Sequence, residues 1–308
     1  MGISHYIKEI GRGARGAKAL ERAQAADLFG QILDCGVSDL ETGAFCIAMR
    51  IKGETLEEMS GFLDATHARI ARFQSDGPPV VVLPSYNGAR KLPVLTPLLA
   101  LLLAREGLPV LLHGMRTEAR RVLASDVLAA LGIAPASAPR TLAAGEVAHI
   151  ETRHLHPGLA RLLAVREVIG LRNPAHSVVK LINPAGPDAL VISSYTHPEY
   201  FETLAATYAA LGMSGLLSRG LEGEVACDPR RWPRYDGFVR GSHQLLQEQG
   251  AGTVPEVPGL PTEIDITTTA RYTQQVLDGR LPVPEALAAQ ARFILRIARQ
   301  VTPEPATP

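Results

Sequence analysis

The sequence predicts an α/β protein with a small all-helical N-terminal domain and a larger α/β domain on a central, mostly parallel sheet. In residues 1–70 the apolar residues recur only at helical spacing. From residue 76 onward strand and helix patterns alternate, as in parallel sheets covered by helices. Short apolar runs rich in β-branched residues, such as Val80–Leu83, are typical of strands buried on both faces.

The N-terminal part shows three amphipathic segments with end signals. Ser38 is a good N-cap because acidic residues follow it in the first turn. Residues 74–79 combine glycine and two prolines and are expected to be a linker. Helices are therefore expected over Ala23–Asp34, 38–49 and 53–69.

The segment from Pro78 to Gly132 has the pattern of a βαβ unit. A strand at 80–83 is followed by a turn-rich loop, an apolar helix over 94–104 and a second strand at 108–112. The tetrapeptide His113-Gly114-Met115-Arg116 comes next and leads into an expected basic helix. Ligands of such sheets gather beyond the carboxyl ends of the strands, where both loops fall. Further strands are expected near 147–150, 189–192 and 215–217, and late helices over 270–277 and 284–300.

Bulk composition limits the function classes. The 31 Lys and Arg residues balance 31 Asp and Glu residues, which excludes a globally basic nucleic-acid binder and leaves only local clusters. The three cysteines lack metal-type spacing and suggest reduced thiols in a cytoplasmic protein. The start has no apolar signal region, and the longest apolar helix falls short of the roughly 20 residues that span a bilayer. We expect a soluble protein with no membrane partner.

A glycine-rich basic segment near the N-terminus admits two interpretations. Residues 11–16 match the letters of a dinucleotide fingerprint, but no strand precedes them and no βαβ unit follows. They either form a flexible basic turn between two helices, which we favour, or a phosphate-contacting arm. The cations of such an arm would be Lys8, Arg12 and Arg15.

Several motifs resemble those of anthranilate phosphoribosyltransferases. Residues 48–58 resemble part of that family's N-terminal domain, and His113–Arg116 resembles its Lys-His-Gly-Asn-Arg segment. The resemblance spans nearly the whole chain and implies the nucleoside phosphorylase and phosphoribosyltransferase fold class. It further implies a helical domain at 1–75, completed by a helical segment near 157–184. The α/β domain would comprise 76–156 and 185–308. A homodimer through the helical domains is also implied.

The departures from that family bear on activity. Its Gly-Thr-Gly-Gly-Asp pyrophosphate loop lies opposite Pro84, Ser85, Tyr86, Asn87 and Gly88, whose side chains should fill the pocket. Its acidic metal pair would lie near 220–224, where adjacent carboxylates are not retained. We therefore predict no catalytic residue and no cofactor or metal site, with Mg²⁺ only if transferase activity is retained. A pyrophosphate-sized hollow with two acids facing this loop would instead indicate an active transferase.

The same pattern is similar to the YbiB-type, TrpD-like branch of the family. That resemblance implies non-specific DNA or RNA binding by a catalytically degenerate homodimer, through phosphate contacts in a basic groove. The alternative is a glycosyl or phosphoribosyl transferase with an altered donor or acceptor. The cations near the carboxyl end of the sheet that would contact phosphate are Arg90, Lys91, Arg116, Arg120 and Arg121. The alternative for Arg120 and Arg121 is a solvated helix face paired with Glu118 and Asp126.

Three residues keep open alternatives. Tyr86 either stacks on a nucleobase or plugs the former phosphate pocket. His113 follows a strand like a general base, but no nucleophile or orienting acid can be assigned to it, so a core or backbone-bonded histidine is the better interpretation. Arg166 resembles the arginine that contacts the aromatic acceptor, so it and His113 would form a remnant acceptor site; a domain-interface ion pair is the other possibility for Arg166.

Overall fold

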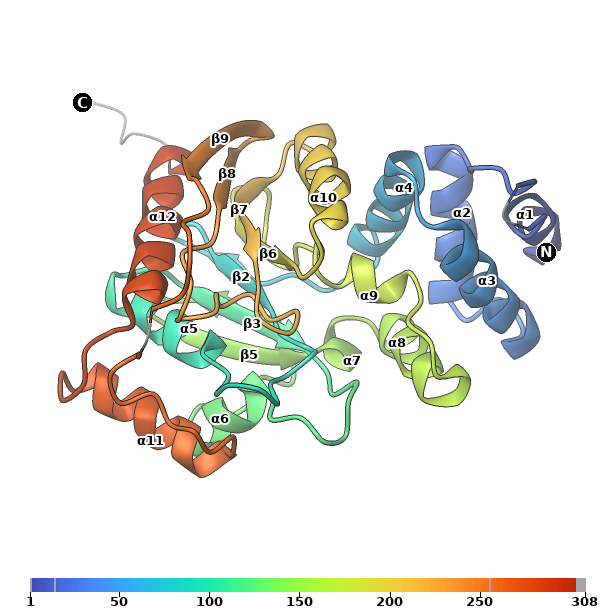
Figure 1. The fold of residues 1–308 in the computed structure, drawn as a ribbon. Helices are drawn as coiled ribbons and strands as arrows, with labels where there is room; N and C mark the ends of the chain where they lie inside the picture. Colours follow the sequence, from blue (N-terminus) through green and yellow to red (C-terminus); the bar gives the residue numbers. More distant parts are fainter. Residues whose placement is uncertain (1, 14, 255, 303–308) are drawn as a thin grey trace. The chain divides into compact units, whose positions relative to one another are not determined.

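The computed structural model describes residues 2–13, 15–254 and 256–302 (Figure 1). The chain divides into two compact units. Unit 1 comprises Met1–Ala71 and Thr152–Pro184, and unit 2 comprises Arg72–Glu151 and Ala185–Pro308. Residues 72–75, expected at the end of the helical domain, thus fall in unit 2, and the second segment of unit 1 begins five residues before the expected 157.

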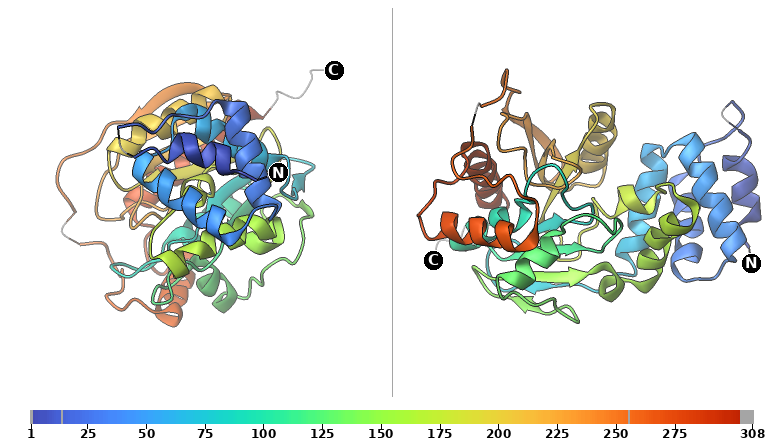
Figure 2. Two further views of the ribbon diagram at one scale, coloured as in Figure 1. Left: turned by 90° about the vertical axis from the view of Figure 1, so that its right-hand side faces the viewer. Right: turned by 60° about the horizontal axis from the view of Figure 1, so that its bottom comes forward.

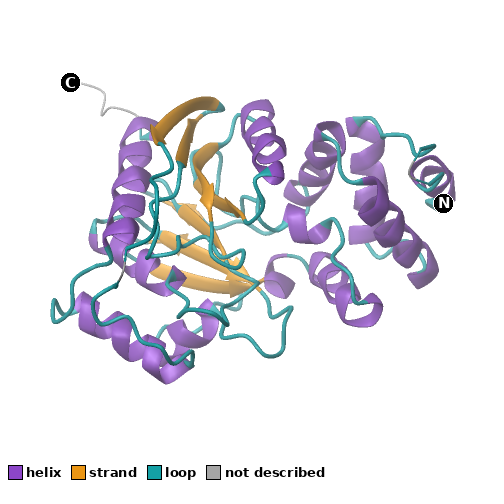
Figure 3. Ribbon diagram, in the orientation of Figure 1, coloured by secondary structure: helices purple, strands orange, loops and turns teal. Residues whose placement is uncertain are grey.

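The described part of unit 1 contains helices and loops only (Figure 3). Its core includes three phenylalanine rings, of which Phe29 and Phe62 stack at 4.6 Å between centroids. Two capping boxes start its third and fourth helices: Ser38 accepts from the backbone N–H of Glu41, and Thr55 from that of Glu58. The helices are α1 (Ser4–Ile10), α2 (Arg22–Leu33), α3 (Asp39–Lys52), α4 (Leu56–His67), α7 (Thr152–Leu155), α8 (Pro157–Ile169) and α9 (Ala175–Val178).

Unit 2 is built on a seven-stranded sheet of order β5-β3-β2-β6-β7-β8-β9. The first five strands in this order run parallel, and β8 and β9 form an antiparallel hairpin at one edge. The strands are β2 (Val81–Pro84), β3 (Val110–Gly114), β5 (Val147–Glu151), β6 (Leu190–Tyr195), β7 (Ser214–Arg219), β8 (Tyr235–Val239) and β9 (Ser242–Gln247). A separate parallel pair joins β1 (Gln74–Ser75) and β4 (Thr141–Leu142).

Helices cover both faces of this sheet (Figure 2). Four of them share a buried apolar cluster with one face of the strands. On the other face Tyr208 of α10 packs against Phe238 of β8, with ring centroids 4.7 Å apart. The helices are α5 (Thr96–Arg105), α6 (Ala124–Ala130), α11 (Ile266–Leu277) and α12 (Glu285–Val301) on the first face, and α10 (Glu199–Ala210) on the second.

This architecture confirms the predicted α/β class with its helical N-terminal part. One expectation was wrong: the segment after Arg116 is not a basic helix, because residues 115–123 form a loop and α6 begins only at Ala124. Val122 in this loop instead pairs with Ala89 as an isolated bridge. The β8–β9 hairpin was not anticipated. Within the described residues, no helix has the length and apolar character needed to cross a membrane.

Candidate functional site at the carboxyl edge of the sheet

The order of the strands places the site. β2 lies between β3 and β6, so the chain reverses its direction of travel across the sheet there. Ligands of open parallel sheets bind at such a switch point, beyond the strand ends. Residues 84–91 leave β2 at this edge, beside the loop that leaves β3. The two loops touch closely, because a Cβ on Gly114 would lie 1.9 Å from the carbonyl oxygen of Ser85.

The degenerate donor loop, Pro84–Gly88, is packed rather than open. Tyr86 is only 1% exposed and Asn87 is fully buried. Thr117 from the next loop donates its hydroxyl to the carbonyl of Tyr86 at 2.9 Å. Tyr86 is therefore a buried plug, and stacking on a nucleobase is excluded for this conformation.

A single carboxylate binds the polar groups of that loop. One oxygen of Glu224 accepts the backbone N–H groups of Asn87 at 3.1 Å and Gly88 at 2.8 Å. Its other oxygen accepts the hydroxyls of Ser85 at 2.5 Å and Thr96 at 3.0 Å. Burial raises the pKa of Glu224, and these four hydrogen bonds oppose that rise. The loop is an anion cradle that holds a carboxylate of its own chain.

Glu222 continues the cradle. Its Oε2 accepts the backbone N–H groups of Arg90 and Lys91, each at 2.9 Å. Its Oε1 lies 3.3 Å from Nε of Arg90. Glu222 and Gly223 both have positive φ, 55° and 88°, so the chain turns sharply between the two carboxylates. The two carboxylates are not adjacent, as expected, because Gly223 separates them, but both face the donor loop.

These acids do not fit a divalent cation in this arrangement. Each carboxylate oxygen of Glu222 and Glu224 already meets an N–H, hydroxyl or guanidinium donor. A bound Mg²⁺ would need those same oxygens as ligands. Among the described residues, no group of three or more His, Cys, Asp or Glu side chains is placed to hold a metal ion.

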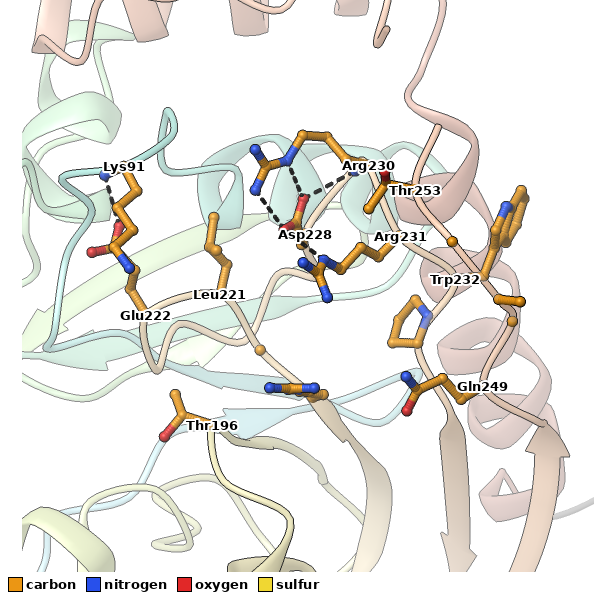
Figure 4. A pocket seen from close by; sticks show the side chains of 16 residues that line it. Lys91, Thr196, Leu221, Glu222, Asp228, Arg230, Arg231, Trp232, Gln249 and Thr253 are labelled. Atoms are coloured by element: carbon orange, nitrogen blue, oxygen red, sulfur yellow. Dashed lines mark hydrogen bonds and ion pairs between the residues drawn. The ribbon is translucent and has the colours of Figure 1, made fainter. Parts of the chain in front are cut away.

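An open cavity of about 650 Å³ adjoins the cradle. Lys91 and Glu222 lie at one end, Trp232 at the other, and Asp228 with two arginines between them (Figure 4). Its walls come from the loops after β2, β6, β7 and β9 and from the segment before β8. They are Lys91, Thr196, Arg219, Gly220, Leu221, Glu222, Asp228, Arg230, Arg231, Trp232, Pro233, Gln249, Gly250, Ala251, Gly252 and Thr253.

The predicted phosphate-binding cations of unit 2 lie at this edge of the sheet but differ in exposure and in ion pairing. Arg116 is held by Asp126 at 2.6 Å and by the carbonyl of Arg121 at 2.8 Å. Arg121 is largely buried: it lies 3.9 Å from Glu118 and donates to the carbonyl of Gly88 at 3.4 Å. Arg120 is exposed and has no ion pair with any described residue. The structure thus makes Arg121 a structural link between the two loops.

The three cations predicted near the N-terminus belong to unit 1. Lys8, Arg12 and Arg15 are all exposed, on or just after α1. Arg12 pairs with Glu9 at 2.7 Å and donates to the carbonyl of Lys8. The described residues of the glycine-rich segment, 11–13 and 15–16, contain turns and a bend between α1 and α2, and both interpretations of the segment stay predictions.

The remnant acceptor residues fall in separate units. His113 ends the core of β3 in unit 2, fully buried, with no hydrogen-bond partner for either ring nitrogen among the described residues. Burial and the nearby His149 lower its pKa to about 3, which keeps the ring neutral. It is a core histidine and is not bonded to backbone. Arg166 lies on α8 in unit 1.

Sequence reasoning missed part of the cavity wall. Arg219 ends β7 and Trp232 precedes β8, and no motif in the sequence indicates that either lies near Lys91. The run Asp228-Pro229-Arg230-Arg231 was a visible signal of the same region. This run lies in the connection from β7 to β8, and the fold brings that connection and the loop after β9 to the same cavity as Lys91.

Known proteins with similar sequences or folds include glycosyl transferase family members. Residues 4–69 match the helical bundle domain of a glycosyl transferase family. A structure of anthranilate phosphoribosyltransferase from Thermus thermophilus superposes with a TM-score of 0.72 at 23% identity, covering 96% of this chain and 93% of that one. The anthranilate phosphoribosyltransferase of Methylobacterium radiotolerans is 33% identical over 175 residues, 56% of this chain and 51% of the relative.

A protein from Escherichia coli (strain K12), YbiB, matches over almost the full length of both chains. It is 38% identical over 297 residues, covering 94% of this chain and 92% of YbiB. With the helical bundle match and the shared fold, this similarity extends beyond one domain. The chain therefore belongs to the YbiB family of TrpD-like proteins, which have the glycosyltransferase family 3 fold.

Proposed function

We propose that this protein binds DNA or RNA without sequence specificity, through phosphate contacts, and does not transfer a phosphoribosyl group. The observation that carries the proposal is the occupied cradle. Glu224 takes the N–H groups of Asn87 and Gly88 that an anionic donor would need. Around it, exposed cations are left for phosphate, such as Arg120 and Lys91.

The chemistry of such a surface favours backbone over base contacts. Guanidinium and ammonium groups attract the repeated phosphates, and the release of counterions makes the binding sensitive to salt. Buried Tyr86 offers no ring for reading a base. Affinity is therefore expected to vary little between sequences.

We further propose a cytoplasmic homodimer formed through unit 1. Three of the exposed large apolar side chains lie on α3, at i, i+7 and i+11: Leu40, Ile47 and Ile51, with exposures of 85%, 37% and 62%. A stripe of this kind marks an interaction face. The cysteines are all free thiols, which supports a reducing compartment.

The proposal is tested by titrating labelled single-stranded oligonucleotides of unrelated sequence with the full chain at several salt concentrations. We expect similar affinities for all sequences and a steep linear fall of log K with log salt. Arg120→Glu should weaken binding about tenfold at low salt and lower the salt slope, because it removes one exposed cation and adds a repulsive charge. Arg296→Glu, an exposed change on α12, is the matched control. Absence of strand binding overturns the proposal.

A transferase with an altered donor or acceptor is the second candidate. The favourable observation is that two acids face the donor loop beside a cavity of about 650 Å³. In that case Glu222 and Glu224 would have to leave the N–H groups and bind Mg²⁺. A screen of phosphorylated sugars with and without Mg²⁺ would then show turnover or a Mg²⁺-dependent melting shift. Turnover replaces the binding proposal with an enzyme, whereas a melting shift without turnover shows only a Mg²⁺-dependent ligand site.

A further inference from the structure

We propose that the cavity between the donor loop and residues 219–233 binds one nucleotide. Its phosphate would lie among Lys91, Arg219 and Arg231, with its base toward the Trp232 wall. This inference rests on the proposed nucleic-acid binding, because that proposal is what makes a nucleotide the expected ligand at that edge of the sheet. It assigns a pocket that the phosphate-contact surface by itself does not require.

The charges in the cavity leave a positive surplus. Four of the lining side chains are cationic and two are acidic. Glu222 is turned to the backbone N–H groups of Arg90 and Lys91, so it does not neutralise the ammonium of Lys91. Asp228 is held in a two-pronged pair with Arg230, at 2.9 Å for each prong.

Three cations therefore remain for a ligand. Neither Lys91 nor Arg219 has an ion pair with any described residue, although both line the cavity. Arg231 shares Asp228 only weakly, at 3.6 Å, and its side chain is 55% exposed. Guanidinium groups match phosphate oxygens in geometry as well as charge. An anion beside any of these three side chains gains charge-assisted hydrogen bonds and leaves the Asp228–Arg230 pair intact.

The shape of the cavity favours more than a bare phosphate. Its volume of about 650 Å³ lies in the usual range for organic ligands, well above the size of one anion. Trp232 lines this cavity and also a smaller one of about 240 Å³, and Arg231 is shared in the same way. An aromatic residue at one end of the cavity suits a nucleobase, and Gln249 lines the same side of the cavity, apart from Trp232 (Figure 4). A nucleotide combines the required anion with a flat ring.

Trp232 is the sole tryptophan of the chain, so its fluorescence reports this cavity directly. We would titrate the full-length protein with AMP, adenosine, inorganic pyrophosphate and a 5′-phosphorylated oligonucleotide, and follow the emission. Calorimetry on the same samples covers a ligand that binds without changing the emission. Anisotropy of a labelled oligonucleotide would measure strand binding separately.

Saturable AMP binding is the expected result, with adenosine and pyrophosphate each weaker by about tenfold because each lacks one half of the ligand. Arg219→Gln and Arg231→Gln should each weaken AMP binding by about tenfold, while Arg296→Gln should not. If the oligonucleotide and AMP compete, the source is a nucleotide within a strand. If AMP binds without competition, the source is a free nucleotide.

Two results would overturn the inference. One is pyrophosphate binding as tightly as AMP, since the base would then contribute nothing. The other is the combination of normal oligonucleotide binding by anisotropy with no sign of AMP binding. In that result the Trp232 emission does not change, calorimetry with AMP detects no heat, and Arg219→Gln changes neither measurement. In the latter case strand binding stands and only the nucleotide pocket is lost. If AMP binds saturably but no strand binds, the nucleotide pocket stands and the proposed nucleic-acid binding is lost.

Discussion

Glu224 shows how one residue can change the use of a shared scaffold position. An anion cradle needs N–H groups that point at a common point, and this loop still provides them. The occupant is a side chain fixed to the same chain, so its effective concentration never falls. A free pyrophosphate must displace a carboxylate that already holds four donors.

Substituting Glu224 gives the first prediction about stability. Glu224→Ala leaves the N–H groups of Asn87 and Gly88 buried without partners and should lower the free energy of unfolding by about 3 kcal/mol. Glu224→Gln should cost far less, because the amide oxygen can accept both N–H groups while its NH₂ donates to the hydroxyls of Ser85 and Thr96. Urea unfolding measures both.

The same pair of variants has a defined pH dependence. Burial raises the folded-state pKa of Glu224 above that of the unfolded chain, so the folded state keeps the proton to higher pH. The wild type therefore loses stability as pH rises from the ordinary carboxyl pKa through the raised one. Glutamine does not titrate, so the wild-type advantage over Glu224→Gln should shrink over that interval. Glu106→Gln, an exposed change, should show no such trend. A constant difference from acid to neutral pH would contradict this account.

At the residue scale the sequence predicted what depends on neighbours in the chain. Ser38 was identified as an N-cap because acidic residues follow it in the first turn, and one of them, Glu41, completes a capping box in the structure. The filled donor loop followed from replacing glycines by Tyr86 and Asn87. The roles of Glu222 and Glu224 could not be predicted. They depend on a sharp turn in which Glu222 has a positive φ, and the sequence does not indicate that conformation.

The parallel strands were predictable because they are buried on both faces. They are runs of buried apolar residues, as in β2 and β3. β9 was missed because none of its side chains is buried and four of the six are polar, which is typical of an edge strand. The segment before α6 was mistaken for helix because charge resembles a solvated helix face. Its backbone is instead used in the bridge between Ala89 and Val122.

The apolar face of α3 carries a prediction at this scale. If Leu40, Ile47 and Ile51 form the dimer contact, Ile51→Glu places a charge in an apolar interface and should produce monomers. Light scattering after size-exclusion chromatography measures the mass, and circular dichroism should be unchanged because the side chain is 62% exposed. Ile266→Glu at the start of α11, which is 38% exposed, is the matched control. A wild-type monomer would overturn the homodimer itself, and a Leu40→Glu/Ile51→Glu protein that remains dimeric would show that the contact lies elsewhere.

At the scale of the whole molecule, net charge conceals the distribution that matters. Lys and Arg equal Asp and Glu in number, 31 each, yet the acids near the cradle are turned onto backbone N–H groups. The cations beside them therefore make fewer ion pairs than the totals imply. No reading of composition could reveal this, because it depends on which partner each carboxylate has in the fold.

Dimerisation and strand binding together give a prediction that neither gives alone. A dimer offers two sets of phosphate contacts, and a strand long enough to reach both gains from effective concentration. Ile51→Glu should therefore weaken binding of a strand of about 40 nucleotides by tenfold or more, while an oligonucleotide of about 8 nucleotides, which occupies one set, changes little.

Anisotropy at low salt measures both affinities, and the salt slope for the long strand should fall toward that of the short one because fewer cations remain engaged. Arg120→Glu provides the contrasting pattern. It removes a contact within each set and should weaken short and long strands alike. Equal losses for both lengths in Ile51→Glu would instead mean that each subunit binds its strand independently, and that the dimer serves another purpose.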